Sequence, residues 1–401
     1  MKLSTVPLAG AALAALTLTG CVANTSADGD AIAVSSTADA CTVSVDSAES
    51  GNISFEVTND GDKVTEFYVL GSDGLRIVGE VENIAPGVTR NLTVQAQPGD
   101  YFTACKPGMV GEGVDQQAFA VTGKAISVDP EDAEAVDTAV AQYVSYTKTQ
   151  AAELVPGVQK FVDAYKAGDD EAARRLFPIA RINYERIEPT AEQFGDLDPK
   201  IDYRKPGAEA EGLEFTGFHR IEMDLWLDEA RKNYPDEKLT ALDEAGRAKV
   251  GDQLVADVKA LYEKVHADDF ALSLGEITNG AIGLLDEVAA PDGKLPGEEN
   301  EFGHTDLYDF YANIEGAEVA YLNVRDIAAA KGARGKELVA ELDKQFTAMK
   351  DLLATYGDYD EGFVFYDTVG QDERNELGAQ LNALSEPMSK LTHTVIGVEA
   401  E

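Results

Sequence analysis

The chain has 401 residues, 44% of them hydrophobic, which is too long for one ordinary core, so two domains or one unusually large domain are expected. Its 33 basic and 73 acidic residues give a formal net charge of −40. This charge excludes a nucleic-acid binder that relies on a basic surface, and it makes a cation the more natural partner. With only four His and three Cys, a site that needs nitrogen or sulfur ligands must use few positions.

Residues 1–21 have the pattern of a lipoprotein signal peptide. Lys2 precedes an apolar run shorter than the ~20 residues of a membrane-spanning helix, and the run ends in Leu18-Thr-Gly-Cys21, which resembles a lipobox. We therefore expect Cys21 to carry a lipid that anchors the mature chain on the extracytoplasmic side of the cell membrane; an ordinary signal peptide is the alternative. Residues 22–39 are rich in small and polar residues and are expected to form a flexible tether.

Residues 40–128 are predicted to form an antiparallel β-sandwich, because short alternating stretches are separated by turn sequences. Apolar and polar residues alternate at 41–45, 53–57, 66–70, 91–95 and 118–121. This segment holds Cys41 and Cys105, an even pair in a compartment where disulfides persist. A disulfide and a pair of thiolate metal ligands are the two alternatives for them. A blue-copper site needs two His ligands and is excluded, since no His precedes His219.

Residues 129–401 are predicted to form an all-α domain, because apolar residues now recur at steps of three and four. The first helical face runs from Val136 to Tyr165 and is expected to be interrupted at Pro156. Short connections favour antiparallel bundles. Further helices are predicted at 171–188, 209–233, 246–272, 274–290, 305–331, 335–356 and 372–393.

The strongest candidate for chemistry is the segment Gly217-Phe-His-Arg-Ile-Glu222. His219 and Glu222 are three residues apart on a predicted helix, so an imidazole and a carboxylate can reach one ion. A peptidase of the His-Glu-x-x-His or His-x-x-Glu-His type would need a second His, and Met223 follows Glu222 instead.

Further polar residues recur on helices that are otherwise apolar. Glu185 and Glu188 share one face, with Arg181 one turn earlier, and a second set runs from His304 to Asn313. If these faces meet, the resulting site suits iron or another hard ion better than copper, and zinc can also bind. A network of ion pairs that braces the bundle is the alternative.

These segments resemble those of the EfeO-type components of iron-uptake systems, which belong to the imelysin family and carry an N-terminal cupredoxin-like domain. The resemblance covers nearly the whole mature chain. It rests on Glu82-Asn-Ile-Ala-Pro-Gly87, Pro98-Gly-Asp-Tyr101 before Cys105, Tyr184-Glu-Arg-Ile-Glu-Pro189, Gly217-Phe-His-Arg-Ile-Glu222, and His304-Thr-Asp-Leu-Tyr-Asp-Phe-Tyr-Ala-Asn313.

The resemblance implies a cupredoxin-like sandwich followed by an imelysin-like helical domain that binds ferrous or ferric iron. Such a protein would pass the ion to an iron permease and work beside a haem peroxidase. For the cupredoxin-like domain the resemblance implies a second metal site made of Cys41, Glu66 and Cys105. In the helical domain it implies a metal site drawn from His219, Glu222, Glu185 and Asp306, with Glu188, His304 and Asp309 as additional candidates.

Two enzymatic functions remain as alternatives to iron transport. The first is a zinc metallopeptidase that uses His219 and Glu222. The second is a copper-dependent ferroxidase in the sandwich, which the lack of His in that domain disfavours.

Overall fold

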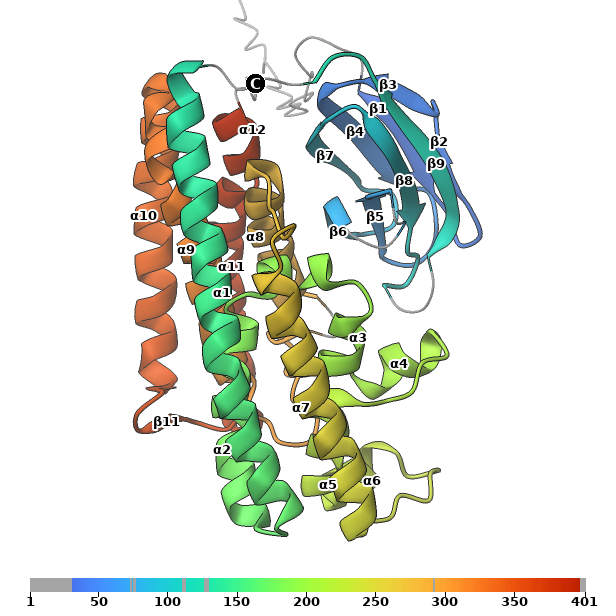
Figure 1. Cartoon of the computed structure of the whole chain (residues 1–401), viewed down its shortest axis with the longest axis vertical. Coiled ribbons are helices and arrows are strands. Elements are labelled where there is room, and N and C mark those ends of the chain that lie inside the picture. Colours follow the sequence, from blue (N-terminus) through green and yellow to red (C-terminus); the bar gives the residue numbers. More distant parts are fainter. Residues whose placement is uncertain are drawn as a thin grey trace, which may run out of the picture.

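The computed structural model describes residues 31–72, 74, 77–109, 113–125, 130–290 and 293–396. Within these residues an N-terminal β-sandwich packs beside a long helical domain (Figure 1). The predicted order of an all-β domain followed by an all-α domain is therefore confirmed. The expected signal peptide with Cys21, and residues 22–30 of the expected tether, lie outside the described residues.

The sandwich consists of a four-stranded sheet and a five-stranded sheet. The four-stranded sheet has the order β2 (Cys41–Val43), β1 (Ile32–Ser36), β4 (Gly51–Asn59), β7 (Thr89–Ala96). The five-stranded sheet has the order β3 (Ser47–Glu49), β9 (Val114–Thr122), β8 (Gly99–Cys105), β5 (Thr65–Leu70), β6 (Ile77–Ile84). Strand β1 pairs with β4, and β3 with β9, in parallel, so the sheets are mixed and not purely antiparallel as predicted.

Strand β1 corrects the expectation of a flexible tether that extends to residue 39. Residues 32–36 pair in register with β4, with Val34 opposite Val57, and Val34 is buried in the core. The alternation of Ile32 and Val34 with small residues is the sequence signal for this strand. It is short and lies in a polar stretch, which explains why the composition alone predicted a tether.

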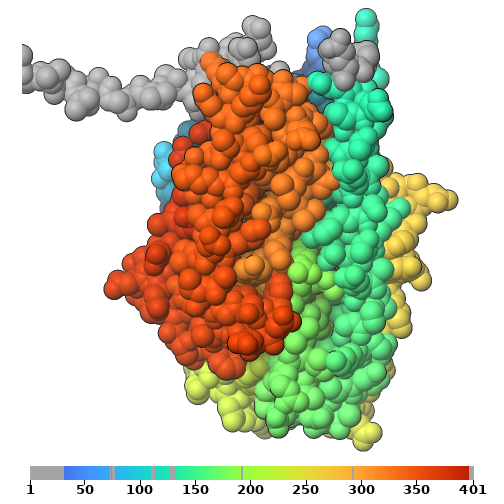
Figure 2. Space-filling model, turned by 90° about the vertical axis from the view of Figure 1, so that its left-hand side faces the viewer, coloured from blue at the N-terminus to red at the C-terminus, as the bar shows by residue number. Residues whose placement is uncertain are grey.

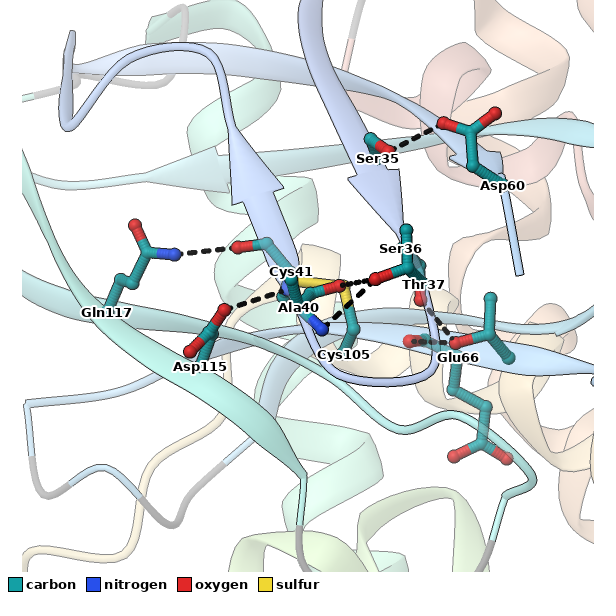
Figure 3. The surroundings of a disulfide bond; sticks show 11 residues. Ser35, Ser36, Thr37, Ala40, Cys41, Asp60, Glu66, Cys105, Asp115 and Gln117 are labelled. Carbon is teal, nitrogen blue, oxygen red and sulfur yellow. Dashed lines mark hydrogen bonds between the residues drawn. A yellow bond between two sulfur atoms is a disulfide. The ribbon is translucent and has the colours of Figure 1, made fainter.

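The core between the two sheets is aromatic and is crossed by a disulfide. The ring of Phe55 lies 5.2 Å from that of Phe67 and 5.6 Å from that of Phe119. Cys41 of β2 and Cys105 of β8 are joined by a disulfide, which connects one sheet to the other (Figure 3). Of the two alternatives for these cysteines, the structure has the disulfide.

The helical domain is built from long helices and several short ones. The long helices are α1 (Pro130–Lys166), α2 (Asp170–Glu185), α7 (Glu244–His266), α8 (Leu274–Val288), α9 (Asp306–Ala330), α10 (Gly332–Leu353) and α11 (Gln371–Met388). The short elements are η1 (Glu188–Phe194), α3 (Leu197–Asp202), α4 (Lys205–Ala210), α5 (Gly217–Leu225), α6 (Leu227–Asn233), η2 (Ala354–Tyr356), the β10 (Gly357–Asp358) and β11 (Gly362–Phe363) pair, η3 (Tyr366–Thr368) and α12 (Leu391–Ile396). Among the described residues, none of the helices combines the length and apolar character needed to cross a bilayer.

Two hydrophobic clusters hold these helices together. One gathers side chains of α8, α9, α10 and α11, including Phe310 and Leu342. The other gathers side chains of α1, α2, α5 and α7, including Phe161 and Phe218. Seen from the side of α10, helices α1 and α10 form part of one closely packed face (Figure 2). Polar residues of the candidate site lie on α2 and α5, which contribute apolar side chains to the second cluster, and on α9, which contributes them to the first.

Two helix predictions need correction. Helix α1 continues through Pro156, although proline cannot donate the usual backbone hydrogen bond, because Leu154 and Val158 on either side are buried against neighbouring helices. The predicted helix at 209–233 is divided into the end of α4, α5 and α6. The division before α5 occurs at Gly217, whose φ of 75° is not helical.

The sandwich is joined to the helical domain through contacts of β6 and β7 with α8. Asn83 donates a 2.6 Å hydrogen bond to the carbonyl oxygen of Asp286, and Arg90 forms a 3.0 Å ion pair with the same residue. A second contact is made by Lys106, whose Nζ lies 3.2 Å from a carboxylate oxygen of Glu211. These contacts place the sandwich next to α3 and α4 (Figure 1), which border the candidate site.

Candidate metal centre

The polar side chains of α2, α5 and α9 converge in a buried region between these helices. Two glycines permit the close approach of these elements. A Cβ at Gly217 would lie 2.1 Å from the carbonyl oxygen of Ile201, and one at Gly316 would lie 2.5 Å from that of Arg186. Only glycine therefore allows α5 to start against α3 and α9 to lie against the end of α2.

The buried guanidinium of Arg181 is the centre of the polar network. Its Nε lies 3.3 Å from Asp309, and its Nη2 lies 2.5 Å from Glu185 and 2.8 Å from Glu299. Its Nη1 donates to Asp202. An arginine side chain with no exposed surface needs such partners, because an unpaired buried charge is costly.

His219 and Glu222 form the pair that their spacing predicts. Nδ1 of His219 lies 2.9 Å from Oε2 of Glu222, and Oε1 of Glu222 accepts hydrogen bonds of 2.9 and 2.8 Å from the backbone amides of Phe302 and Gly303. Glu222 is thus held rigidly and in turn holds the imidazole. Carboxylates that orient a ligand histidine through its second nitrogen are common around protein metal ions.

The other ring nitrogen of His219 faces two carboxylates that the sequence analysis missed. Nε2 lies 3.3 Å from Oε1 of Glu299 and 3.6 Å from Oδ1 of Asp202. One ligand atom from each of these three residues lies within 4.8 Å of the others. Asp202 ends the short helix α3 and Glu299 lies in a loop, so neither belongs to a periodic pattern that would predict its position.

The predicted acids Glu185, Glu188, Asp306 and Asp309 belong to the same buried network. Besides Arg181, Lys294 and two asparagines hold them together. Nζ of Lys294 lies 3.0 Å from Glu188 and 3.5 Å from Glu185.

The two asparagines complete these contacts. The side-chain amide of Asn313 donates hydrogen bonds to Glu185 and Glu188, of 3.1 and 2.6 Å. The side chain of Asn300 donates to Asp309, and its backbone amide donates a 3.1 Å bond to Asp306. Among the described contacts, these four acids are therefore neighbours of the His219 cluster and not its direct partners.

The structure does not bring His304 into this network. Its φ of 55° turns the chain just before α9, and its Nε2 lies 4.0 Å from a carboxylate oxygen of Glu229. Its imidazole lines a separate pocket of about 610 Å³ that also contains Trp226.

Burial and the crowding of charges shift the pKa values in the network. Burial raises the pKa of Asp306 to about 7, and it raises those of Glu185, Glu188 and Asp309 well above the usual carboxyl range. Glu299 differs, because Lys294 and His219 outweigh burial and lower its pKa.

The pKa of His219 is raised to about 9. Burial and Arg181 lower this pKa, but hydrogen bonds to Glu222 and Glu299 together with the charge of Asp202 outweigh them. The network therefore holds protons that a metal ion can displace.

The donor set fits a hard metal ion with one nitrogen ligand. Asp202 and Glu299 would supply oxygen, His219 would supply nitrogen, and Glu222 would orient the imidazole. Several buried oxygen atoms also have no hydrogen-bond partner among the described residues: Oδ2 of Asp306, Oδ1 of Asn300 and Oδ1 of Asn313. Such atoms call for a further polar partner, and an ion with its water ligands would provide one.

A pocket of about 500 Å³ leads from the surface to this network. Asp202 and Glu299 form part of its wall, and so do Lys106 and Met109 of the sandwich. The pocket thus lies between the two domains and opens onto two of the candidate ligands.

The second metal site proposed for the sandwich is not supported in the form predicted. The sulfur atoms of Cys41 and Cys105 are bonded to each other and cannot act as thiolate ligands. The carboxylate of Glu66 accepts a hydrogen bond from Tyr68 and points away from the disulfide (Figure 3).

Comparison with known proteins gives the class of the chain. Residues 139–391 match the family model of imelysin, which is named for peptidase family M75, and residues 10–114 match that of the cupredoxin-like domain. The chain therefore belongs to the imelysin family and carries an N-terminal cupredoxin-like domain.

Similar curated proteins include the iron uptake system component EfeO of Escherichia coli and of Shigella flexneri, each 33% identical over 390 residues that cover 96% of both chains. These matches confirm the predicted resemblance. A crystal structure of an imelysin-like protein from Psychrobacter arcticum aligns with 70% of this chain and all of its own, with 13% identity and a TM-score of 0.43.

Proposed function

We propose that this protein is an extracytoplasmic component of an iron-uptake system that binds ferrous or ferric iron and passes it to a membrane permease. The observation that carries the proposal is the buried group of Asp202, His219 and Glu299, with ligand atoms within 4.8 Å of one another. Relatives that match along 96% of the chain are iron uptake components, which favours iron as the cargo.

In this proposal the three residues bind the ion and the surrounding acids balance its charge. Carboxylates suit the hard ferric ion, and the imidazole adds a directional ligand. The pocket between the domains supplies the route, because its wall already includes Asp202 and Glu299. The acidic surface, with a formal charge of −40 for the whole chain, would raise the local concentration of cations.

The remaining parts of the proposal concern location and partners. We propose that Cys21 carries a lipid anchor, and that the permease and a haem peroxidase of the same system are the partners. A Cys21→Ser variant should then leave the membrane fraction and appear as soluble protein. Membrane association that survives this substitution would contradict the anchor.

The alternative of a zinc metallopeptidase is less consistent with the contacts of Glu222. A general base must have an oxygen that can accept a proton from the attacking water. One carboxylate oxygen of Glu222 is hydrogen-bonded to His219, and the other accepts hydrogen bonds from two backbone amides. Cleavage of unfolded casein by the zinc-loaded protein, abolished in Glu222→Gln, would favour the peptidase instead.

Titration calorimetry with ferrous iron under anaerobic conditions tests the proposed site. Asp202→Asn should weaken binding by more than ~100-fold, because it removes a direct anionic ligand, whereas loss of an outer partner costs about 10- to 100-fold. Asp257→Asn is the matched control, since Asp257 is a buried acid of α7 that is bonded to Gln253 and does not belong to the network around His219. Equal affinities in the wild type and Asp202→Asn would contradict the site.

A further inference from the structure

Arg181 contacts all three candidate ligand atoms. Its Nη1 donates to Oδ1 of Asp202 and lies 3.1 Å from Nε2 of His219. Its Nη2 lies 2.8 Å from Oε1 of Glu299. The guanidinium therefore lies against the atoms that would surround the ion.

An ion bound at these atoms and Arg181 in this position exclude each other. Nε2 of His219 can bind a metal ion only through its lone pair, after its proton has left, and Nη1 of Arg181 lies 3.1 Å from this nitrogen on the side of the candidate ligands. The positive charge of Arg181 would also repel a cation at such short range, and burial leaves little water to screen it. Binding of the ion thus requires the guanidinium to move.

The network offers Arg181 partners that are not candidate ligands. Its Nε lies 3.3 Å from Asp309 and its Nη2 lies 2.5 Å from Glu185. Its guanidinium carbon also lies 5.8 Å from the centre of the Phe177 ring on the same helix, α2. A shift toward Asp309 and Glu185 would release Asp202, His219 and Glu299 while the buried charge stays paired.

We propose that Arg181 is an exchangeable internal cation that competes with the iron ion for Asp202, His219 and Glu299. This inference rests on the proposed function. The competition lowers the affinity of the site, and the return of Arg181 replaces the departing ion. In a transport component this exchange would favour release of the ion, because the guanidinium takes up the partners that the ion leaves.

Lys294 provides a matched control for this role. It is the other buried cation of the network, but its contacts are with Glu188, Glu185, Glu287 and Oε2 of Glu299. Among the candidate ligands it therefore contacts Glu299 alone in the described residues, at 3.9 Å and through the oxygen that does not face Nε2 of His219. Arg181→Met and Lys294→Met each remove one buried positive charge, so a general electrostatic effect should strengthen cation binding similarly in both.

Titration calorimetry with ferrous iron and with zinc, on chelator-treated protein, separates competition from general electrostatics. We expect Arg181→Met to bind each ion at least ~10-fold more tightly than Lys294→Met does, which corresponds to about 1.4 kcal/mol. Equal affinities in the two variants, or weaker binding in Arg181→Met than in the wild type, would overturn the role of Arg181. Absence of binding in the wild type and in both variants would instead contradict the proposed function.

A crystal structure of the wild-type protein with zinc provides a second test that needs no variant to fold. We expect the guanidinium to have left Asp202 and His219 and to remain bonded to Asp309 and Glu185. An ion at His219 with Arg181 still within hydrogen-bond distance of its Nε2 would overturn the inference while leaving the proposed function intact.

Discussion

Glu222 holds the imidazole of His219 from behind, through a 2.9 Å contact between Oε2 and Nδ1. Its other oxygen is fixed by the backbone amides of Phe302 and Gly303. This arrangement leaves Nε2 of His219 directed at Asp202 and Glu299. The two residues of the motif therefore have different roles. His219 can bind an ion directly, and Glu222 orients its imidazole.

Glu222→Gln tests this division. The glutamine oxygen can still accept from the two backbone amides, which places its NH₂ group against Nδ1 of His219. Nδ1 must then act as an acceptor, so the proton of the neutral imidazole moves to Nε2, where it blocks metal binding. We expect iron affinity to fall by about 10- to 100-fold in titration calorimetry.

Stability distinguishes the orientation effect from a general loss of structure. Glu222→Ala leaves the amides of Phe302 and Gly303 without their partner, which costs about 1–3 kcal/mol for each buried group. Glu222→Gln keeps both hydrogen bonds and should therefore unfold at a higher temperature than Glu222→Ala. Wild-type iron affinity in Glu222→Gln would argue against an orienting role.

Iron affinity should increase with pH between 6.5 and about 9. The pKa of His219 is raised from 6.5 to about 9, so over this interval the imidazole in the folded protein carries a proton that must leave when the ion binds. Each proton released contributes up to ~10-fold in affinity for each pH unit. Calorimetry in buffers with different heats of ionisation measures this release directly, and a binding heat independent of the buffer would contradict it.

The same pKa shift has the opposite effect on the chelator-treated protein. Because the folded-state pKa of His219 lies above its ordinary value, its stabilising contribution is complete below pH 6.5 and is lost as the pH rises through about 9. Substitution by glutamine removes this contribution. The difference in unfolding free energy between the wild type and His219→Gln should therefore decrease over this interval.

Gly217→Ala should damage both stability and ion binding. A Cβ there would lie 2.1 Å from the carbonyl oxygen of Ile201, so α5 and His219 with it must shift. We expect a loss of roughly 3 kcal/mol or more in the free energy of unfolding. Gly212→Ala is the control, because Gly212 also has a positive φ but a Cβ there meets no atom within 4 Å, which limits the cost to about 1–2 kcal/mol.

Removal of the disulfide should weaken the sandwich without weakening the helical site. Cys41 and Cys105 are 64 residues apart in sequence, and a crosslink of this span contributes ~4 kcal/mol in the chain-entropy estimate. The double variant Cys41→Ala/Cys105→Ala should therefore lose about that stability in denaturant unfolding. Iron affinity that falls while the helical domain remains folded would indicate that the sandwich supplies ligands.

Much of the architecture could be predicted because it depends on local patterns. The change from alternation to helical spacing near residue 130 separates the two domains, and the spacing of His219 and Glu222 places them on one face of α5. Two predictions failed where burial decided the outcome. Helix α1 passes through Pro156 because its flanking residues are packed, and β1 forms within the predicted tether because Val34 enters the core.

The sequence by itself determined the family, the two-domain order and the histidine–glutamate pair, since each follows from motifs or from spacing within one element. Only the tertiary structure decided which residues meet at Nε2 of His219. Asp202 and Glu299 come from a short helix and a loop far apart in the chain, while His304 turns into another pocket. The periodicity of residues within one helix or strand cannot predict such contacts. They depend on how α3, α5 and the loop before α9 pack around the buried charge of Arg181.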